Sequence, residues 1–322
     1  QAEYLPIPDN IQYVNTSTIS GSNLYFTGSI IDGKKTFTDE NGEEIEYDNY
    51  RSALFKMDVE TGDCTELTEF QLPEVPEGWM GSTELNTIQT GADGTLWAIY
   101  GSYTYRYNPP ADLAEDDSMY NYYEQGENKT GLLHLDADGK ELKRIEFSQT
   151  DEDGNSLYVS SFFVDNSGNV YLSDWQNVYI YDQDGNKKTT VDLGENGGDL
   201  CELKAGVVGV SYYKNDEAKP EESGRVFQEI DPATGKLTGD TVKLPDSAYS
   251  FFPGDDVYDI YYDYNGNIYG YKFDTDTKDK EIDWIECDIN SNNINSYSIL
   301  PDGRVIAFEN SYDDQAQKNN MQ

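Results

Sequence analysis

The chain has 322 residues, of which 62 are Asp or Glu and 22 are Lys or Arg, so its formal net charge is −40. A field of this sign repels nucleic acids and anionic lipid headgroups, because both are bound through Lys and Arg. The sequence has no run of about 18 apolar residues, so we expect no membrane-spanning segment. The 27 Tyr and 12 Phe residues suit strands and can bury large areas.

Two short patterns recur along the chain and predict a repeat protein. The first is a tight turn that leads into an apolar or aromatic strand, and the second is a strand that ends at Asp. Internal repeats of this kind indicate a radial or stacked array of small sheets. We therefore predict an all-β, six-bladed β-propeller with four-stranded antiparallel blades, and residues 1–322 as a single domain. The first pattern occurs at residues 22–25, 94–97, 168–171, 206–208, 266–269 and 303–306, and the second at 54–58, 132–136, 178–182, 227–231 and 284–288.

The predicted blades differ mainly in the length of their loops. Residues 1–10 contain two prolines and lead into blade one as an edge strand or connector. Blade one covers residues 11–67, with a long acidic loop at 32–50. Blade two follows a connection at 68–84 and carries the longest insertion, at 101–130, where 111–122 is compatible with one short helix. Blade three, at 162–193, is compact, and blades four and five have polar loops at 214–224 and 274–281.

The last predicted blade is incomplete. It begins at Tyr297, and the chain ends where a third strand should begin. Either residues 4–7 close the ring as a strand taken from the start of the chain, or the natural protein continues past Gln322. We expect both, with the final strands lying partly beyond this sequence.

The insertions fall on one side of the predicted ring. In a four-stranded meander, the first-to-second and third-to-fourth turns share one rim, and the second-to-third loops share the other rim with the connections between blades. The first set is short, whereas every long segment belongs to the second set. Because loops on a rigid scaffold commonly carry function, we expect this long-loop rim to be the working surface.

Aromatic residues on the long-loop rim are the candidate binding residues. Aromatic rings beside Asn, Asp and Gln suit stacking on sugars or anchoring of a protein partner. The alternative is that these rings only fold the insertion onto the rim. Trp97 and Trp284 lie in predicted strands and should be packing residues. The candidates are Trp79, Tyr103, Tyr105, Tyr122, Tyr123 and Trp175.

Acidic clusters raise the possibility of a bound cation. The pair Asp182 and Asp184 precedes Gly185, which places Gly fourth, whereas a calcium-binding EF-hand loop needs Gly at its sixth position. We interpret such D-x-D-G sequences as hairpin-turn chemistry. Weak candidates for a Ca²⁺ site remain on the long-loop rim of blade five, at Asp274, Asp276 and Asp279. No cofactor is otherwise indicated.

No catalytic motif stands out. His134 is the only His, and it lies between two leucines in a predicted strand, so we interpret it as structural. The three Cys residues have no metal-ligand spacing and are expected to be buried thiols. A Cys64–Cys201 or Cys201–Cys287 disulfide remains an open alternative.

The repeats resemble those of a known class of proteins. The pattern D-x-x-G-N-[VI]-Y at 165–171 and 263–269, and V-Y-x-Y-D-x-x-G at 178–185, resemble propeller repeats of bacterial surface and periplasmic proteins. The chain also resembles the acidic propeller region that precedes the solute-binding domain in extracellular lipoproteins of ABC importers from Gram-positive bacteria. This resemblance implies an extracellular or cell-surface location and transfers no catalytic residue.

The sequence therefore favours a non-enzymatic binding or accessory module associated with solute import. Its expected partner is a carbohydrate, a peptide or an adjacent solute-binding domain, bound at the long-loop rim. One alternative is a metal-dependent propeller hydrolase, lactonase or lyase with a cation on the axis. Another is a structural spacer, since fold alone does not choose between functions.

Overall fold

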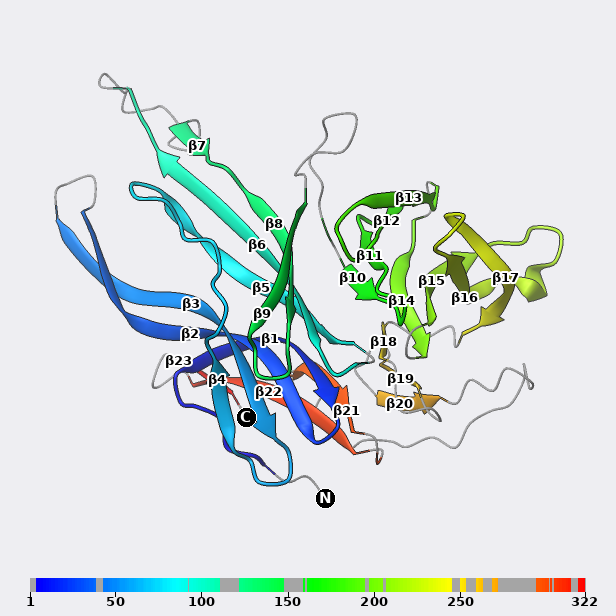
Figure 1. The fold of residues 1–322 in the computed structure, drawn as a ribbon, viewed down its shortest axis with the longest axis horizontal. Helices are drawn as coiled ribbons and strands as arrows, with labels where there is room; N and C mark the ends of the chain where they lie inside the picture. The colour runs from blue at the N-terminus through cyan, green and yellow to red at the C-terminus, as the bar shows by residue number, and fades with distance from the viewer. Residues whose placement is uncertain are drawn as a thin grey trace.

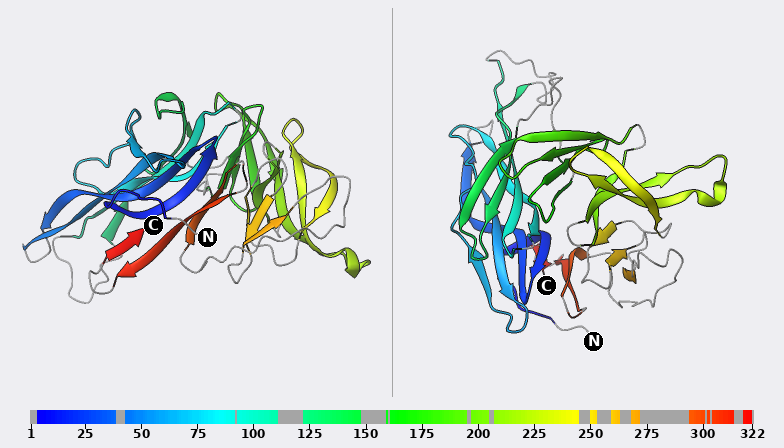
Figure 2. Two further views of the ribbon diagram at one scale, coloured as in Figure 1. Left: turned by 90° about the horizontal axis from the view of Figure 1, so that it is seen from below. Right: turned by 45° about the vertical axis from the view of Figure 1, so that its right-hand side comes forward.

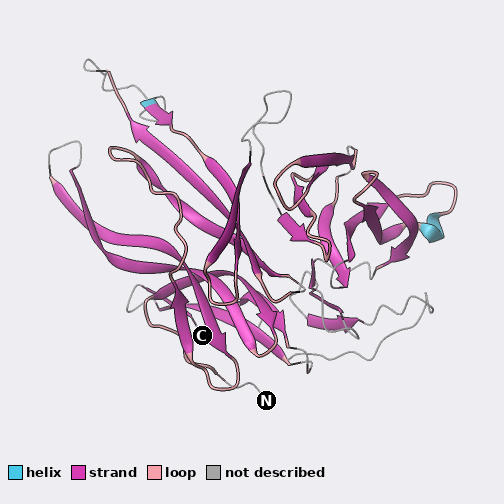
Figure 3. Cartoon of the chain, in the orientation of Figure 1, coloured by secondary structure: helices cyan, strands magenta, loops and turns pink. Residues whose placement is uncertain are grey.

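The computed structural model describes residues 4–38, 43–91, 93–110, 122–147, 159, 161–194, 197–204, 207–244, 250–252, 259–262, 268–271, 294–300, 302, 304–313 and 318–321. These residues are nearly all in strands and tight turns, with a short helical turn at Pro220–Glu222 (Figure 3). Within this described part, no helix is long and apolar enough to cross a membrane.

The described strands form six sheets, in which neighbouring strands pair antiparallel in chain order, except that β6 of sheet two pairs with both β7 and β8. The three sheets of the N-terminal half are sheet one, with β1 (Ile11–Ser20), β2 (Asn23–Thr38), β3 (Glu44–Asp58) and β4 (Cys64–Leu67); sheet two, with β5 (Met80–Thr90), β6 (Leu96–Tyr107), β7 (Tyr123–Gln125), β8 (Lys129–Leu135) and β9 (Glu141–Phe147); and sheet three, with β10 (Ser161–Val164), β11 (Val170–Ser173), β12 (Asn177–Tyr181) and β13 (Lys187–Asp192).

The C-terminal half continues the same order. Its sheets are sheet four, with β14 (Asp199–Lys204), β15 (Val207–Lys214), β16 (Gly224–Asp231) and β17 (Lys236–Lys243); sheet five, with β18 (Ser250–Phe252), β19 (Asp259–Tyr262) and β20 (Ile268–Tyr271); and sheet six, with β21 (Ile294–Ile299), β22 (Val305–Asp313) and β23 (Lys318–Met321). The prediction of an all-β chain with four-stranded antiparallel sheets is confirmed. Four sheets contain a four-stranded meander, whereas sheets five and six show three described strands each.

The first strands of sheets one to five lie next to one another in chain order. Strand β1 contacts β5, β5 contacts β10, β10 contacts β14, and β14 contacts β18. Strand β21, the first strand of the last sheet, contacts β1, so the two ends of the chain meet (Figures 1 and 2). Sheets that radiate from adjacent first strands are the arrangement of a β-propeller.

The core consists of separate apolar clusters between neighbouring sheets. Successive side chains of a strand point to opposite faces, and in β2 Leu24 and Phe26 pack toward sheet six, whereas Tyr25 packs toward sheet two. Strand β11 repeats this division, with Leu172 toward sheet two and Tyr171 toward sheet four. Each of these sheets therefore buries both of its faces.

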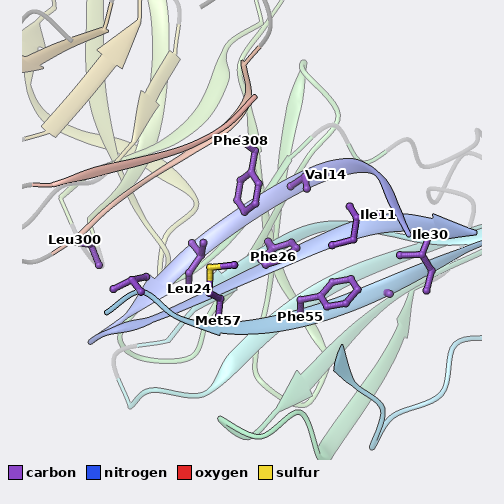
Figure 4. Packing of buried hydrophobic residues seen from close by; sticks show 11 residues of the cluster. Ile11, Val14, Leu24, Phe26, Ile30, Phe55, Met57, Leu300 and Phe308 are labelled. Carbon is purple, nitrogen blue, oxygen red and sulfur yellow. The ribbon is translucent and has the colours of Figure 1, made fainter. Parts of the chain in front are cut away.

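The cluster between sheets six and one joins the ends of the chain. Phe308 of β22 lies over Phe26 of β2, with ring centroids 4.8 Å apart, and Phe26 stacks on Phe55 of β3 at 5.1 Å (Figure 4). All three rings are at most 3% exposed. This aromatic contact holds the C-terminal strands against the N-terminal sheet.

The D-x-x-G turns have the role that the sequence predicts. In the turn that starts at Asp182, the carboxylate accepts hydrogen bonds from the backbone N–H groups of Asp184 and Asn186, at 2.8 and 2.9 Å. Gly185 has φ +82°, a left-handed conformation that favours glycine. The side chain and backbone of Asn186 lower the pKa of Asp182, so this carboxylate is engaged in the turn. Turns of the same form start at Asp136 and Asp165.

Two predicted loops are instead largely hairpin arms. Most of residues 32–50 belongs to β2 and β3, which remain paired as far as Thr38 and Glu44. The insertion at 101–130 is partly strand, because β6 continues to Tyr107 and pairs there with β7.

Both arms do alternate large and polar side chains, as at Ile45 and Tyr47 of β3 and at Tyr103 and Tyr105 of β6. The loop predictions missed this strand pattern. The large side chains lie outside the core, with Ile45, Tyr47 and Tyr103 exposed by 42%, 45% and 48%.

The predictions for the chain ends and for blade five need correction. Residues 4–7 form no strand, although Leu5 and Ile7 pack against the cluster between sheets six and one. The described part of sheet six does include a third strand, β23, which pairs with the end of β22. In sheet five, the strand predicted to be second is β20, the third described strand of its sheet.

Replacement of Leu54, which is fully buried between sheets one and two, tests this packing. We expect Leu54→Ala to lower the free energy of unfolding by about 2–5 kcal/mol, since it removes buried atoms and leaves a cavity. Chemical denaturation provides the measurement. Leu142→Ala is the control, because Leu142 is 52% exposed and should change stability by about 0.5 kcal/mol or less. Equal effects of the two replacements would contradict the packing described here.

Candidate functional site

Two hairpin arms extend from sheets one and two on the long-loop rim (Figure 1). The arm of sheet one consists of the end of β2 and the start of β3, and Lys34 pairs across it with Asp48 at 2.7 Å. The arm of sheet two consists of the start of β5, the end of β6, and β7. These arms place polar residues beyond the apolar clusters of the ring.

An open cleft of about 910 Å³ lies between the two sheets at the base of the arms. The connection at residues 68–79, which joins sheet one to sheet two, forms one of its sides. The cleft combines aromatic, hydroxyl, amide and charged groups, a mixture that suits a polar ligand. Aliphatic side chains also line it, and the full lining is Tyr13, Asn15, Ser29, Lys35, Asn49, Tyr50, Arg51, Ser52, Ala53, Glu66, Leu67, Thr68, Phe70, Leu72, Pro73, Glu74, Val75, Gly81, Ser82, Thr83 and Glu84.

The sheet-one side of the cleft has a fixed cation. The Arg51 guanidinium donates from Nη1 to Glu66 Oε1 at 2.6 Å and from Nε to Asp32 Oδ2 at 2.8 Å. The hydrogen bond to Glu66 is the main cause that raises the pKa of Arg51. Arg51 is therefore held in place by two carboxylates.

At the inner end of the cleft, sheet two is tied to sheet one through Leu85 of β5. The Leu85 N–H donates to Ser52 Oγ at 3.0 Å, and the Leu85 carbonyl accepts from Asn15 Nδ2 at 3.3 Å. Two residues earlier, the Thr83 hydroxyl donates to the carbonyl of Pro73 in the connection, at 2.7 Å. The start of β5 thus borders the cleft instead of packing against sheet one.

Four tyrosines of the sheet-two arm form a ladder on the face that looks toward sheet three. Tyr103, Tyr105 and Tyr107 alternate along β6 on the same face as the buried Trp97. Ring centroids are 5.4 Å apart for Tyr103 and Tyr105, 5.8 Å for Tyr105 and Tyr123, and 5.3 Å for Tyr107 and Tyr123. Tyr103 and Tyr123 are 48% and 41% exposed. The candidates Tyr103, Tyr105 and Tyr123 are therefore brought together on this arm.

Trp79 lies on the opposite face of the same arm. The Arg106 guanidinium lies 4.7 Å from the centroid of the Trp79 ring, and Arg106 also pairs with Glu124 at 2.6 Å. Tyr122 meets the arm through its carbonyl, which accepts from the Asn108 N–H at 2.9 Å. The sequence candidates on sheet two are thus divided between two faces.

Trp175 stands apart, in the loop between β11 and β12. It is 49% exposed and has φ +83°, an unusual conformation for a bulky residue. Its ring lies directly against Gly197, where a Cβ atom would meet Nε1 at 2.1 Å. The glycine therefore leaves the space that this tryptophan occupies beside the next sheet.

The axis of the ring is filled by polar contacts between first strands. Gln89 of β5 accepts from the Val164 N–H at 2.7 Å and donates to Glu202 Oε1 of β14 at 3.0 Å. Glu202 is 5% exposed. Among the described residues, no group of three His, Cys, Asp or Glu side chains could hold a metal ion. The weak candidates Asp274, Asp276 and Asp279 lie outside the described residues.

The His134 side chain packs against neighbouring residues of sheet two. Its ring stacks on Trp97 at a centroid distance of 3.8 Å, and Nε2 lies 2.8 Å from Thr95 Oγ1. Since the Thr95 hydroxyl donates to Asp93 at 2.6 Å, it accepts from His134, and the proton of a neutral ring is therefore on Nε2. Burial lowers the pKa of His134, partly offset by the charge of Asp93.

The pKa of this single His can be tested by NMR. We expect His134 to titrate below its ordinary value of about 6.5. The unfolded chain then binds a proton more readily than the folded chain, so this residue should cost stability as the pH falls through about 6.5. Free energies of unfolding measured across this range should show that loss in the unmodified protein and a smaller loss in His134→Gln. A pKa above 6.5 would contradict the prediction.

Two of the three cysteines are described, and both are free thiols. Burial raises the pKa of Cys64 to about 11 and also raises that of the buried Cys201. The prediction of a buried thiol is confirmed for Cys201, whereas Cys64 is only partly buried, and a bridge between the two is excluded. Cys287 lies outside the described residues.

Comparisons with known proteins give no family. No protein-family model matches the chain, and no curated protein matches it. Solved structures do match, among them regucalcin, a calcium-binding protein from Agrobacterium tumefaciens, with a TM-score of 0.43, 13% identity, and coverage of 97% of this chain and 90% of that one.

Two further structural matches are of the same quality. The C-terminal WD40 domain of Sif2 has a TM-score of 0.42 and 13% identity, with coverage of 98% of this chain and 75% of that one. A protein of unknown function from Bacteroides caccae has a TM-score of 0.35 and 11% identity, with coverage of 96% and 82%. TM-scores this low carry no argument, so the propeller arrangement rests on the strand order and sheet packing of this chain itself.

Proposed function

We propose that this chain is a non-enzymatic binding module, a propeller of six blades that takes a ligand or partner in the cleft between sheets one and two. The six sheets in chain order and the contact between β1 and β21 support the ring. On the sheet-two arm, Trp79 lies on the face opposite the tyrosine ladder. The ladder itself looks toward sheet three, so it is a second exposed aromatic surface on the same rim.

The observation that carries this proposal is the open cleft itself. Elsewhere between sheets one and two, apolar side chains fill the interface, as Leu54 and Leu85 do with no exposed surface. At the base of the arms, the sheets separate, and polar side chains such as Asn15, Ser82 and Glu84 line the opening together with apolar ones such as Leu72 and Val75. A spacer needs no such opening, whereas a binding module does.

We also propose that the module works outside the cytoplasm, as an accessory to a solute-import system. The support is the resemblance of the repeats to those of bacterial surface proteins and the charge of −40. Carbohydrate, peptide and an adjacent solute-binding domain are the partners that this proposal includes.

Filling the cleft tests the binding function. Thr68 is exposed at the cleft wall, after the end of β4, so Thr68→Trp should obstruct the cleft without disturbing a strand. The labelled protein is applied to a glycan array and a peptide array, and the best ligand is then titrated. We expect Thr68→Trp to weaken that binding at least about tenfold, a change of about 1.4 kcal/mol.

Ser167→Trp is the matched control, because Ser167 is exposed in a tight turn of sheet three on the opposite rim. It should bind as the unmodified protein does, and thermal unfolding should show that both variants are folded. Blank arrays, or equal binding by the two tryptophan variants, would refute a binding function for the cleft.

A further inference from the structure

We propose that the start of β5, at residues 81–84, is a strand-addition site for an extended, Lys- or Arg-containing peptide segment of another protein. This inference rests on the proposed binding function of the cleft and names the class of ligand. The peptide would pair with the free edge of β5, and its alternate side chains would meet the two sides of the cleft.

The edge of β5 is free because of its hydrogen-bond register. In an antiparallel pair, residues alternate between bonding to the partner strand and pointing away from it. Leu85 points away from β6, because its N–H and C=O bond to Ser52 and Asn15 of sheet one. By alternation, the backbone groups of Thr83 and Gly81 also point away from β6, toward the cleft.

The hydrogen bonds of the partner strand β6 independently support this orientation of the Gly81 backbone groups. Opposite Gly81 in the register is Thr104 of β6. The Thr104 N–H donates to Asn128 Oδ1 at 3.2 Å, and its C=O accepts from the Gly126 N–H at 2.8 Å. Since Thr104 is turned away from β5, Gly81 and Thr104 form a non-hydrogen-bonded pair. By this register, the backbone groups of Gly81 and Thr83 do not bond to β6. Within the described residues, no turn or loop hydrogen bond joins these groups to another backbone group.

The free edge lies inside the cleft and has a defined length. Residues 81–84 all line the cleft, and the bonds of Leu85 to sheet one close it at the inner end. With a rise of about 3.4 Å per residue, the four positions span roughly 10–14 Å. This length offers the N–H and C=O groups of two outward-pointing residues to a short extended segment.

The charges around the edge favour a cationic segment. Glu84 on β5 and Glu74 on the connection are exposed, and neither is in an ion pair with another described residue. The connection at 68–79 has three Glu residues and no Lys or Arg. Lys35 is the opposing cation, since Arg51 is already paired with two carboxylates. The net charge of −40 adds a long-range field of the same sign.

These features select a peptide over the other possible occupants. A row of alternating backbone donors and acceptors matches another extended backbone, whereas sugars offer no such repeat. A second copy of this chain would bring the same charge of −40 to the interface, and such self-association is opposed by repulsion. A basic segment from a different protein satisfies both the edge and the charge.

Backbone methylation of a probe peptide tests the strand pairing. The probe is an alternating lysine–valine peptide, compared with its glutamate–valine counterpart and with two versions N-methylated on either the lysines or the valines. In a paired strand, only one alternate set of N–H groups faces β5. We expect one methylated version to bind like the parent, the other to lose at least about tenfold in affinity, and the glutamate peptide not to bind.

Charge reversal locates the binding. Glu74→Arg combined with Glu84→Arg should weaken the lysine–valine peptide at least about tenfold. Glu217→Arg combined with Glu221→Arg is the matched control, since both residues are exposed on the loop between β15 and β16 and the change in net charge is the same. Equal losses would show that the peptide responds only to the overall field, which would overturn the proposal.

Amide hydrogen exchange gives a readout on the edge itself. In the free protein, the Thr83 amide should exchange faster than those of Ser82 and Glu84, which face β6. The lysine–valine peptide should slow exchange at Thr83 alone among the three. A Thr83 amide that is protected without peptide, or two methylated peptides that bind equally, would refute strand addition.

The cleft would still be a binding site if the array ligand remained sensitive to Thr68→Trp after strand addition had failed. Array ligands insensitive to that variant would instead refute the proposed function. The two failures are therefore distinguishable.

Discussion

The structure depends on sheets that bury both of their faces. A sheet with only one buried face can form the outermost layer of a protein. In β2, however, the adjacent residues Tyr25 and Phe26 point to opposite faces, and both are at most 1% exposed. Each therefore needs a neighbouring sheet on its own side. The same holds for Tyr171 and Leu172 in β11. A series of such sheets has unsatisfied faces only at its two ends, and the contact of Phe308 with Phe26 brings those ends together.

Closure around a centre makes a second demand, on the first strands. These strands approach one another, so their side chains must be small or must satisfy each other's polar groups. Ser17 of β1 lies 2.7 Å from the hydroxyls of both Ser296 and Ser298 of β21, and Thr18 lies 3.0 Å from the hydroxyl of Thr90 of β5. Buried hydroxyls that pair with one another avoid the cost of unsatisfied polar groups. Packing of the apolar faces brings the first strands together at the axis, and the polar side chains there pair with one another as a result.

The features that the sequence could predict are local ones. The turn at Asp165 is readable because its carboxylate, its glycine and the following strand lie within a few residues, and strands such as β11 are readable from their apolar run. The arms were predicted as loops because their strands are stabilised by cross-strand pairs, such as Lys34 with Asp48, and not by burial. The cleft was missed for a related reason. The contacts that define it, such as Leu85 with Ser52, join residues 33 positions apart.

The arms also explain why a free strand edge exists at all. Within the ring, the inner edge of β5 has β1 and β10 as neighbours. The arm carries β5 outward beyond their reach, so its edge loses its neighbours while its pairing with β6 continues. An exposed edge invites unwanted pairing, which proteins counter with charge and backbone kinks. Glu84 supplies charge, and Gly81, at φ +131°, supplies a conformation in which a Cβ would collide with the Tyr103 carbonyl. The same acidity that repels identical copies of the chain attracts a basic strand, so protection of the edge and selection of its partner follow from one property.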